Sequence, residues 1–134
     1  MKKKYDIMVA GHVCFDLIPR FMDSGATQIQ DIIAPGKLVN IGECMMSTGG
    51  PVSNTGIGLK KLGHRVCFSA RIGDDKFGEL TRDFLNHSGN AEGIRTMSNQ
   101  SSSYTIALSP PNIDRTFLHN PGTNNFFSPD DLNP

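Results

Sequence analysis

A glycine pair that leads through a proline into a helix is the feature that most constrains this chain. Residues 47–58 read STGGPVSNTGIG. Glycine lets the backbone approach a ligand closely and adopt angles that a Cβ forbids, and a helix start offers unpaired N–H groups and a positive dipole end. The stretch therefore predicts a bend at which the chain holds a polar small molecule.

The segments around this bend predict an α/β fold. The apolar residues after the bend indicate a helix that ends at Gly63, and a buried strand is expected over residues 65–72. Asp74 and Asp75 supply a cap for a second helix, which ends at Gly89. A first strand over residues 5–9 has no polar alternation, which is typical of a strand covered on both faces. This order favours a mostly parallel sheet with helical crossovers.

Other strands look exposed rather than buried. Residues 31–41 and 43–48 alternate between apolar and polar side chains, residues 94–96 suggest a further short strand, and residues 104–108 and 116–119 flank a turn-rich segment typical of a hairpin. The hairpin could extend a small half-exposed sheet. Such a sheet suits a lid over a ligand or an oligomer contact, and an ordinary meander is the plainer alternative.

Composition narrows the possible partners and compartment. The 134 residues suit one domain, and 13 basic residues balance 13 acidic ones, so no overall field would attract nucleic acid or anionic lipid. The three cysteines are widely spaced, so we expect buried thiols in a reducing compartment. The apolar run near the start is too short for a signal peptide, and no segment is long enough to span a membrane. We therefore expect a cytoplasmic protein.

Several familiar site motifs are absent. Neither a phosphate loop nor a complete dinucleotide fingerprint occurs, and no serine or cysteine lies in a recognisable nucleophile motif. His12, Cys14 and Asp16 alternate, but no second ligand cluster completes a metal shell. We expect no metal site here, and we interpret His64, His87 and His119 as solvated or capping histidines. Asp16 just beyond the first strand is either a site group or a turn or helix-cap aspartate.

Four segments together resemble a known family. GHVCFDLI, TGGPVSNTGIGLKKLG, ARIGDDKFG and RTFLHNPGTNNFF are similar, in order and spacing, to the N-terminal portion of the ribokinase family, also called the PfkB family of carbohydrate kinases. The resemblance implies a ribokinase-like three-layer sandwich with a small β-sheet lid, here near residues 32–48 and 104–119. It also implies a sugar kinase that uses ATP and Mg²⁺, with a lid that closes over the sugar and forms a homodimer interface in several members.

The resemblance also implies roles for individual residues. Asp16 matches an aspartate that binds sugar hydroxyls, Gly49 and Gly50 match glycines that let the backbone approach the sugar, and Asn54 matches a sugar-binding asparagine. Possible lid or turn contacts are Tyr104, Gly122 and Asn124, the last two with an equally plausible structural role. The lid strands would lie around Val39, Met45, Tyr104 and Phe117. Cys14 departs from the asparagine found in many members, which leaves the sugar unspecified.

The end of the chain predicts that this sequence is the front part of a longer protein. Ser128, Pro129, Asp130 and Asp131 form a helix start that has no helix body after it. The family's Gly-Ala-Gly-Asp signature, which supplies the catalytic base, does not occur. We therefore expect no catalytic residue in this chain and no activity of the chain alone. The alternative is a non-catalytic ligand-binding or dimerisation module with a kinase-like fold.

Overall fold

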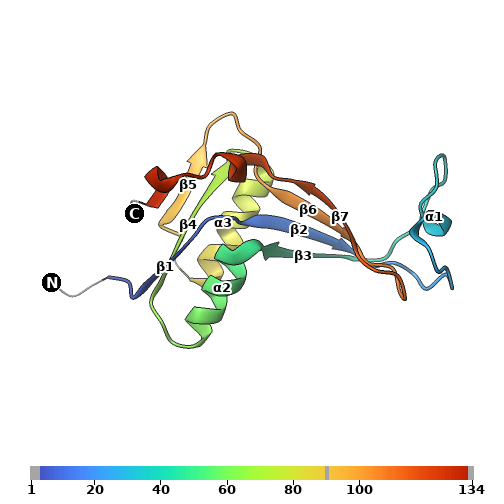
Figure 1. Ribbon diagram of the computed structural model, residues 1–134, viewed down its shortest axis with the longest axis horizontal. Coiled ribbons are helices and arrows are strands. Elements are labelled where there is room, and N and C mark those ends of the chain that lie inside the picture. The colour runs from blue at the N-terminus through green and yellow to red at the C-terminus, as the bar shows by residue number, and fades with distance from the viewer. Residues whose placement is uncertain (1–3, 90, 133–134) are drawn as a thin grey trace.

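Two sheets meet at a corner in the computed structural model, which describes residues 4–89 and 91–132 (Figure 1). The first is a 3-stranded parallel sheet in the order β1-β4-β5, with bounds Ile7–Ala10, Val66–Gly73 and Gly93–Met97. We call it the core sheet. Because its strands are parallel, each connection crosses over through a helix or longer segment, as expected from the order of segments in the sequence.

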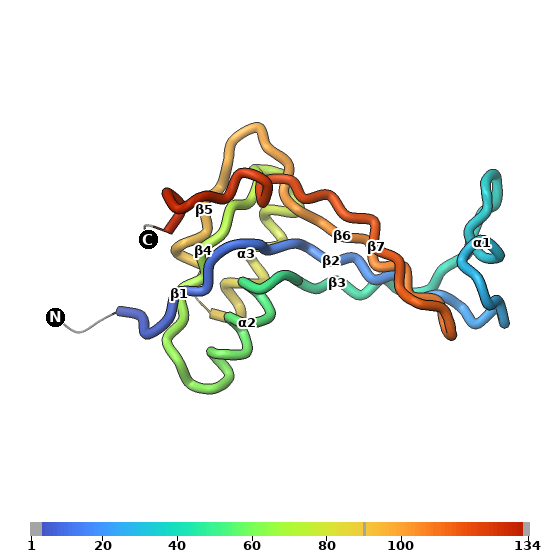
Figure 2. Tube along the Cα trace, viewed as in Figure 1, coloured from blue at the N-terminus to red at the C-terminus, as the bar shows by residue number. Residues whose placement is uncertain are grey.

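The second sheet extends away from the core as a long arm. It has 4 strands in the order β3-β2-β6-β7, with bounds Cys44–Gly49, Cys14–Pro19, Tyr104–Leu108 and Thr116–Asn120. We call it the lid sheet. β2 is antiparallel to β3 and parallel to β6, and β6 and β7 form the predicted hairpin. Figure 2 shows these four strands running side by side toward the end of the molecule that lies farthest from both termini.

Helices α2 (Gly50–Lys61) and α3 (Lys76–Ser88) pack on one face of the core sheet. The centre of this core is Phe68, which is 0% exposed and lies directly against Gly56 of α2. Asp75 caps α3 by accepting a hydrogen bond from the Gly78 N–H at 2.9 Å. Further buried apolar residues complete the core: Val13, Val52, Val66, Ala70, Ile72, Leu85, Ala91 and Ile94.

The opposite face of β4 is polar and is covered by two 3-10 turns, η1 (Gly122–Phe126) and η2 (Pro129–Leu132). Arg71 Nε donates to both carboxylate oxygens of Asp131 at 2.8 Å, and the hydroxyl of Ser69 donates to the Asp131 carbonyl at 2.9 Å. Hydrogen bonds to Asp131 outweigh its burial and hold the pKa of its carboxyl below the usual value. These contacts fasten the last described turn to the core sheet.

The structure confirms the α/β fold with its parallel sheet, both helices and the separate lid sheet. The predicted strand over residues 31–41 is wrong. Helix α1 (Ile29–Ile32) occupies its start, and the rest is irregular because Pro35 and Gly36 interrupt the chain and a turn closes from Lys37 N–H to Ala34 O at 3.1 Å. Val39 therefore lies outside the lid strands.

Two expectations about burial are also corrected. β1 is half-buried rather than covered on both faces, and Met8 is 37% exposed, because β1 is an edge strand that pairs only with β4 in the described sheet. Cys14 and Cys67 are buried thiols as predicted, but Cys44 is exposed at the end of lid strand β3. The absence of polar alternation in a short strand therefore does not show that both of its faces are covered.

Candidate acceptor site on the lid sheet

Asp16 lies inside a strand and not in a loop. It belongs to β2, where it pairs with Ser47 of β3 on one side and Thr105 of β6 on the other. The alternating geometry of a strand places Phe15 on the opposite face, where its ring contacts Phe77 and Phe84 of α3. The half-buried Asp16 carboxylate is therefore on the face of the lid sheet that points away from α3, which we call the Asp16 face.

The glycine pair brings the chain against this face. At Gly49 an added Cβ would overlap Asp16 Oδ2 and would lie 3.1 Å from Cys14 Sγ. Gly50 has a φ of +83° and passes close to the His12 carbonyl, which also accepts a hydrogen bond from the Val52 N–H at 3.2 Å. Only glycine adopts this backbone angle readily. The bend thus lets helix α2 start directly beside the Asp16 carboxylate.

For a substrate bound on the Asp16 face, Gly49→Ala is expected to lower kcat/KM by about 10²-fold, because the added methyl group would displace the Asp16 carboxylate by an ångström or more. Steady-state kinetics with the complete protein would measure this loss, and thermal unfolding would show whether the fold survives. Gly58→Ala is the matched control, since nothing lies within 4 Å of the Cβ added there. Equal kinetics for the two variants would contradict the role of Gly49.

Asn54 is near the start of α2 but is not joined to Asp16. Its exposed side chain lines a shallow hollow of about 330 Å³ that also includes Ser47, Phe84 and Lys61. Among the described residues, no hydrogen bond links the Asn54 and Asp16 side chains. The local contact beneath Asn54 is a 2.6 Å hydrogen bond between the Thr48 and Ser53 hydroxyls. The structure therefore places Asn54 on a separate wall, next to the glycine pair.

The three residues predicted as possible lid or turn contacts do not lie beside the Asp16 carboxylate. Tyr104 stacks on Phe77 at 4.7 Å between ring centroids, so it lies on the α3 side of the lid sheet. Asn124 clamps Val13 with its side-chain amide, accepting from the Val13 N–H at 3.3 Å and donating to its carbonyl at 2.9 Å. Gly122 passes so close to the Ser101 carbonyl that a Cβ would clash. Asn124 and Gly122 hold the corner between the two sheets.

His12 and His119 also lie on the Asp16 face, and neither was predicted as a site residue. The rings of His12 and His119 stack at 5.5 Å between centroids, and His119 Nδ1 lies 2.9 Å from the Thr105 hydroxyl. Thr105 pairs with Asp16 on one side and with His119 on the other. His119 is thus hydrogen-bonded as well as solvated. Only the register of β6 and β7 reveals this neighbourhood, which a single sequence does not give.

Burial and neighbouring charges perturb two of these groups. Desolvation, followed by the hydrogen bond and charge of Asp16, raises the pKa of the Cys14 thiol to about 12. Desolvation lowers the pKa of His12, the positive charge of His119 lowers it further, and the negative charge of Asp16 opposes both effects. The site therefore holds a protonated thiol and favours the neutral form of His12.

No group of three or more His, Cys, Asp or Glu side chains that could hold a metal ion occurs within residues 4–89 and 91–132. Over the same ranges, no helix combines the length and apolar character needed to cross a bilayer.

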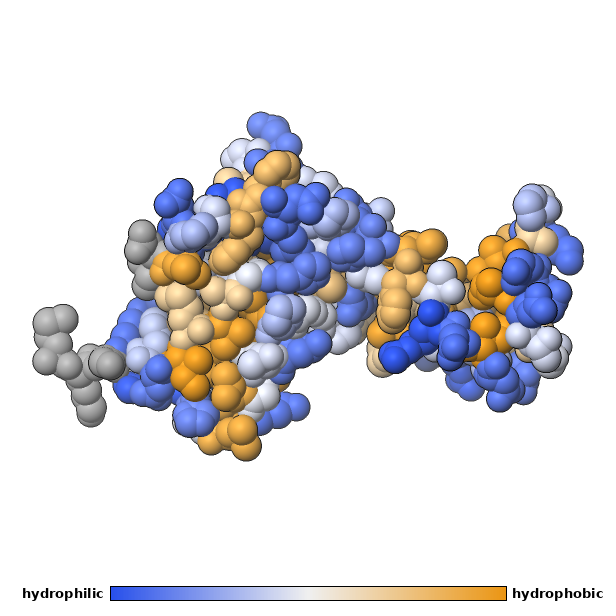
Figure 3. All heavy atoms as spheres, viewed as in Figure 1, coloured by the Kyte–Doolittle hydropathy of each residue, from blue (hydrophilic) through white to orange (hydrophobic). Residues whose placement is uncertain are grey.

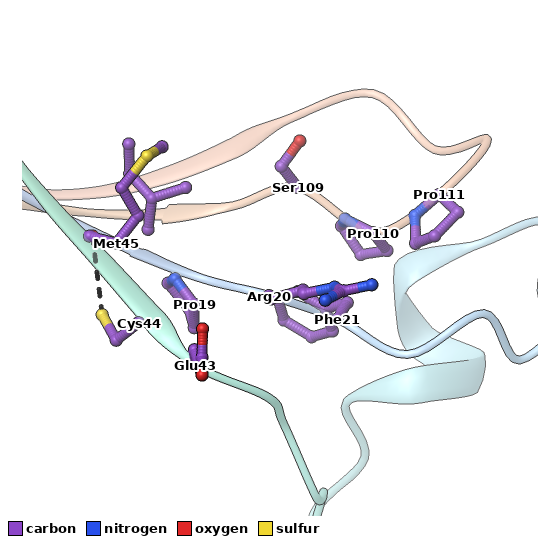
Figure 4. A pocket seen from close by; sticks show the side chains of 10 residues that line it. Pro19, Arg20, Phe21, Glu43, Cys44, Met45, Ser109, Pro110 and Pro111 are labelled. Atoms are coloured by element: carbon purple, nitrogen blue, oxygen red, sulfur yellow. Dashed lines mark hydrogen bonds between the residues drawn. The ribbon is translucent and has the colours of Figure 1, made fainter.

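A larger hollow of about 640 Å³ lies at the far end of the lid sheet (Figure 4). Arg20 and Glu43 lie at its rim, and Pro110 and Pro111 of the hairpin turn close one side. None of the predicted site residues lines it. Size alone would favour this hollow, but the combination of carboxylate, imidazole and close glycine backbone favours the Asp16 face for a polar ligand.

Comparisons with known proteins agree with the fold. The family model for pfkB family carbohydrate kinase matches residues 5–133. The chain is 32% identical over 88 residues to the Arabidopsis thaliana protein named probable fructokinase-4, an alignment covering 63% of this chain and 27% of that protein. It is 30% identical over 88 residues to 5-dehydro-2-deoxygluconokinase of Clostridium perfringens, covering 66% of this chain and 22% of that protein.

A solved structure shares the same architecture. Ribokinase from Giardia lamblia superposes with a TM-score of 0.74 at 19% identity, covering 93% of this chain and 38% of that one. At this identity the likeness concerns the fold alone. The chain aligns with 27% and 22% of the lengths of the two curated relatives above.

Proposed function

Because the chain belongs to the pfkB family of carbohydrate kinases, we propose that it is the acceptor-binding and lid part of a sugar kinase. In this proposal, residues 1–134 are the N-terminal part of one kinase domain in a cytoplasmic enzyme. The intact enzyme transfers the γ-phosphate of ATP to a hydroxyl of a sugar or related polyol. The catalytic base comes from other sequence, since the Gly-Ala-Gly-Asp signature is not among these residues.

The observation that carries the proposal is the Asp16 carboxylate held against Gly49 on the Asp16 face. An ionised carboxylate accepts hydrogen bonds only, and its two oxygens suit the hydroxyl groups of a sugar. Gly49 and Gly50 let the backbone lie directly against Asp16 and His12. Asn54 on the neighbouring wall offers both a hydrogen-bond donor and an acceptor. These groups orient the acceptor, while the lid sheet excludes water from it.

ATP and Mg²⁺ are proposed as cofactors of the intact enzyme, with most of the residues that bind them outside this chain. The described residues contain no cluster that could hold the metal ion, and they offer no phosphate loop. When bound, ATP with Mg²⁺ supplies the phosphoryl group and neutralises charge on it.

The lid sheet also supports a proposed homodimer. Apolar side chains are exposed along β3 and β7, where Met45 is 61% and Phe117 is 56% exposed. Figure 3 shows apolar residues at the surface among polar ones at the lid end of the molecule. Exposed apolar patches of this kind mark contact surfaces. The same observation favours the alternative function, a non-catalytic module that binds a ligand or dimerises through its lid.

A kinase assay of the complete protein separates these functions. Fructose, ribose, a nucleoside and a keto-deoxy sugar acid would each be supplied with ATP and Mg²⁺, and we expect phosphorylation of at least one of them. A folded protein that binds a member of this panel but phosphorylates none would favour the non-catalytic module. The identity of the preferred acceptor would then define the specificity that the Asp16 face confers.

A further inference from the structure

A chain of hydrogen bonds crosses three strands of the lid sheet and ends on Asp16. Thr105 Oγ1 lies 2.9 Å from His119 Nδ1 and donates to Cys14 Sγ at 3.7 Å, and Cys14 Sγ donates to Asp16 Oδ1 at 3.1 Å. The four residues come from β7, β6 and β2. We call this chain the relay. Both inner members are buried, so water does not compete freely for their hydrogen bonds.

The relay has one direction. A threonine hydroxyl carries a single hydrogen, so donating it to the Cys14 sulfur leaves the Thr105 oxygen to accept a hydrogen bond from His119. In this arrangement Nδ1 of the His119 ring carries a hydrogen. The thiol remains a donor at neutral pH because burial raises its pKa to about 12. The hydrogen bonds thus run from His119 through Thr105 and Cys14 to the Asp16 carboxylate.

This direction determines what an approaching ligand meets. With the hydrogen on Nδ1, the neutral His119 ring presents the lone pair of Nε2, which has no hydrogen-bond partner in the described residues. Asp16 adds its carboxylate, of which Oδ1 is fixed by the thiol and Oδ2 lies over Gly49. Since Asp16 and His119 flank Thr105 on neighbouring strands, their backbones are about 10 Å apart, a span that one sugar-sized molecule bridges.

The charge of the Asp16 face argues against an anionic acceptor. The titratable groups that meet there are Asp16, Cys14, His12 and His119, and Asp16 takes part in none of the ion pairs of the described residues. Two positive charges on the stacked histidine rings would repel each other. A carboxylate on the acceptor would therefore be repelled by Asp16, with which no lysine or arginine of the described residues forms an ion pair.

From this geometry we propose that Asp16 and His119 accept hydrogen bonds from two hydroxyls of one uncharged polyol, and that Thr105 and Cys14 are positioning residues that fix both acceptors. The inference rests on the proposed kinase function and narrows its substrate class from any sugar or sugar acid to uncharged sugars and polyols. The names of the relatives do not decide between these classes, since one is a fructokinase and another a kinase of a dehydro-deoxygluconate.

Kinetics of the complete protein test the inference. Thr105→Val removes the hydroxyl at nearly constant volume, and we expect KM for the acceptor to rise about tenfold with KM for ATP unchanged. Thr105→Ser keeps the hydroxyl and should restore the wild-type value. Thr116→Val, at an exposed position on β7, is the matched control and should leave both constants unchanged. The wild-type protein should prefer fructose or ribose to a keto-deoxy sugar acid.

Three results would overturn the inference: a Thr105→Val variant with the wild-type KM for the acceptor, an equal loss in Thr105→Val and Thr105→Ser, or a preference for the sugar acid. A protein that phosphorylates no acceptor would instead contradict the proposed function. The relay is then decided by ¹⁵N NMR of the histidine rings, which does not depend on activity. The relay requires His119 to be protonated on Nδ1 in the wild type and to lose this preference in Thr105→Val, and an Nε2-protonated wild-type ring would refute it.

Discussion

Asp16→Ala is expected to lower kcat/KM for the acceptor by about 30- to 700-fold, which corresponds to a loss of about 2–4 kcal/mol of binding or transition-state stabilisation. The carboxylate is the strongest hydrogen-bond acceptor on its face of the lid sheet, and hydrogen bonds to a charged group are worth more than neutral ones. Its loss would also leave the Cys14 thiol without its acceptor. Steady-state kinetics of the complete protein over the acceptor panel would measure the effect.

Asp114→Ala provides the control for this experiment. Asp114 is an exposed aspartate in the turn of the β6–β7 hairpin, so its removal changes the net charge by the same amount without touching the Asp16 face. We expect wild-type kinetics from that variant. If Asp16→Ala retained the wild-type kcat/KM for every acceptor in the panel, Asp16 would be removed from the site and the proposed function would lose its main support.

Phe68→Ala is expected to lower the free energy of unfolding by about 3–5 kcal/mol, the cost of removing a large aromatic side chain from a core that cannot collapse around the cavity. Phe68 is fully buried and its ring fills the space left by Gly56, so it joins β4 to α2. The whole stability of a small domain is about 5–15 kcal/mol, so this loss is a large part of it. Chemical denaturation would measure the change.

Phe126→Ala is the matched control for this substitution, since Phe126 is 60% exposed at the end of η1. An exposed position should change the free energy of unfolding by less than about 0.5 kcal/mol. A Phe68→Ala variant that unfolds at nearly the same denaturant concentration as Phe126→Ala would mean that β4 and α2 do not depend on this contact.

The core could be predicted from sequence because its signals are local. A glycine just after the end of each helix, an aspartate cap before α3 and the apolar run of β4 are each local signals, and all of them were found in the structure. The prediction of a strand over residues 31–41 was wrong because strand formation depends on pairing, which is not a local signal. Its alternation was real, but a strand needs a partner, and no lid strand pairs with this segment.

The candidate site was only partly predictable because it depends on pairing between distant strands. The family resemblance selected Asp16, Gly49 and Gly50, and these residues do lie together. It did not select Thr105 or His119, whose proximity to Asp16 comes from the register of β2, β6 and β7. It also grouped Asn54 with Asp16, whereas the described contacts place them on separate walls.

The lid sheet joins the core sheet at a corner, so a rotation about this corner would displace distant residues of the lid sheet farther than near ones. The chain enters the lid after Gly11, which has a φ of +123°, and returns to the core at Gly50, while the Asn124 amide pins Val13 between them. Asp16 is about 10 Å along β2 from this fulcrum, and the end of the strand at Pro19 is about 20 Å away. Any rotation about the corner would therefore move the tip about twice as far as the carboxylate. A displacement of 1 Å at the carboxylate therefore corresponds to about 2 Å at the end of β2.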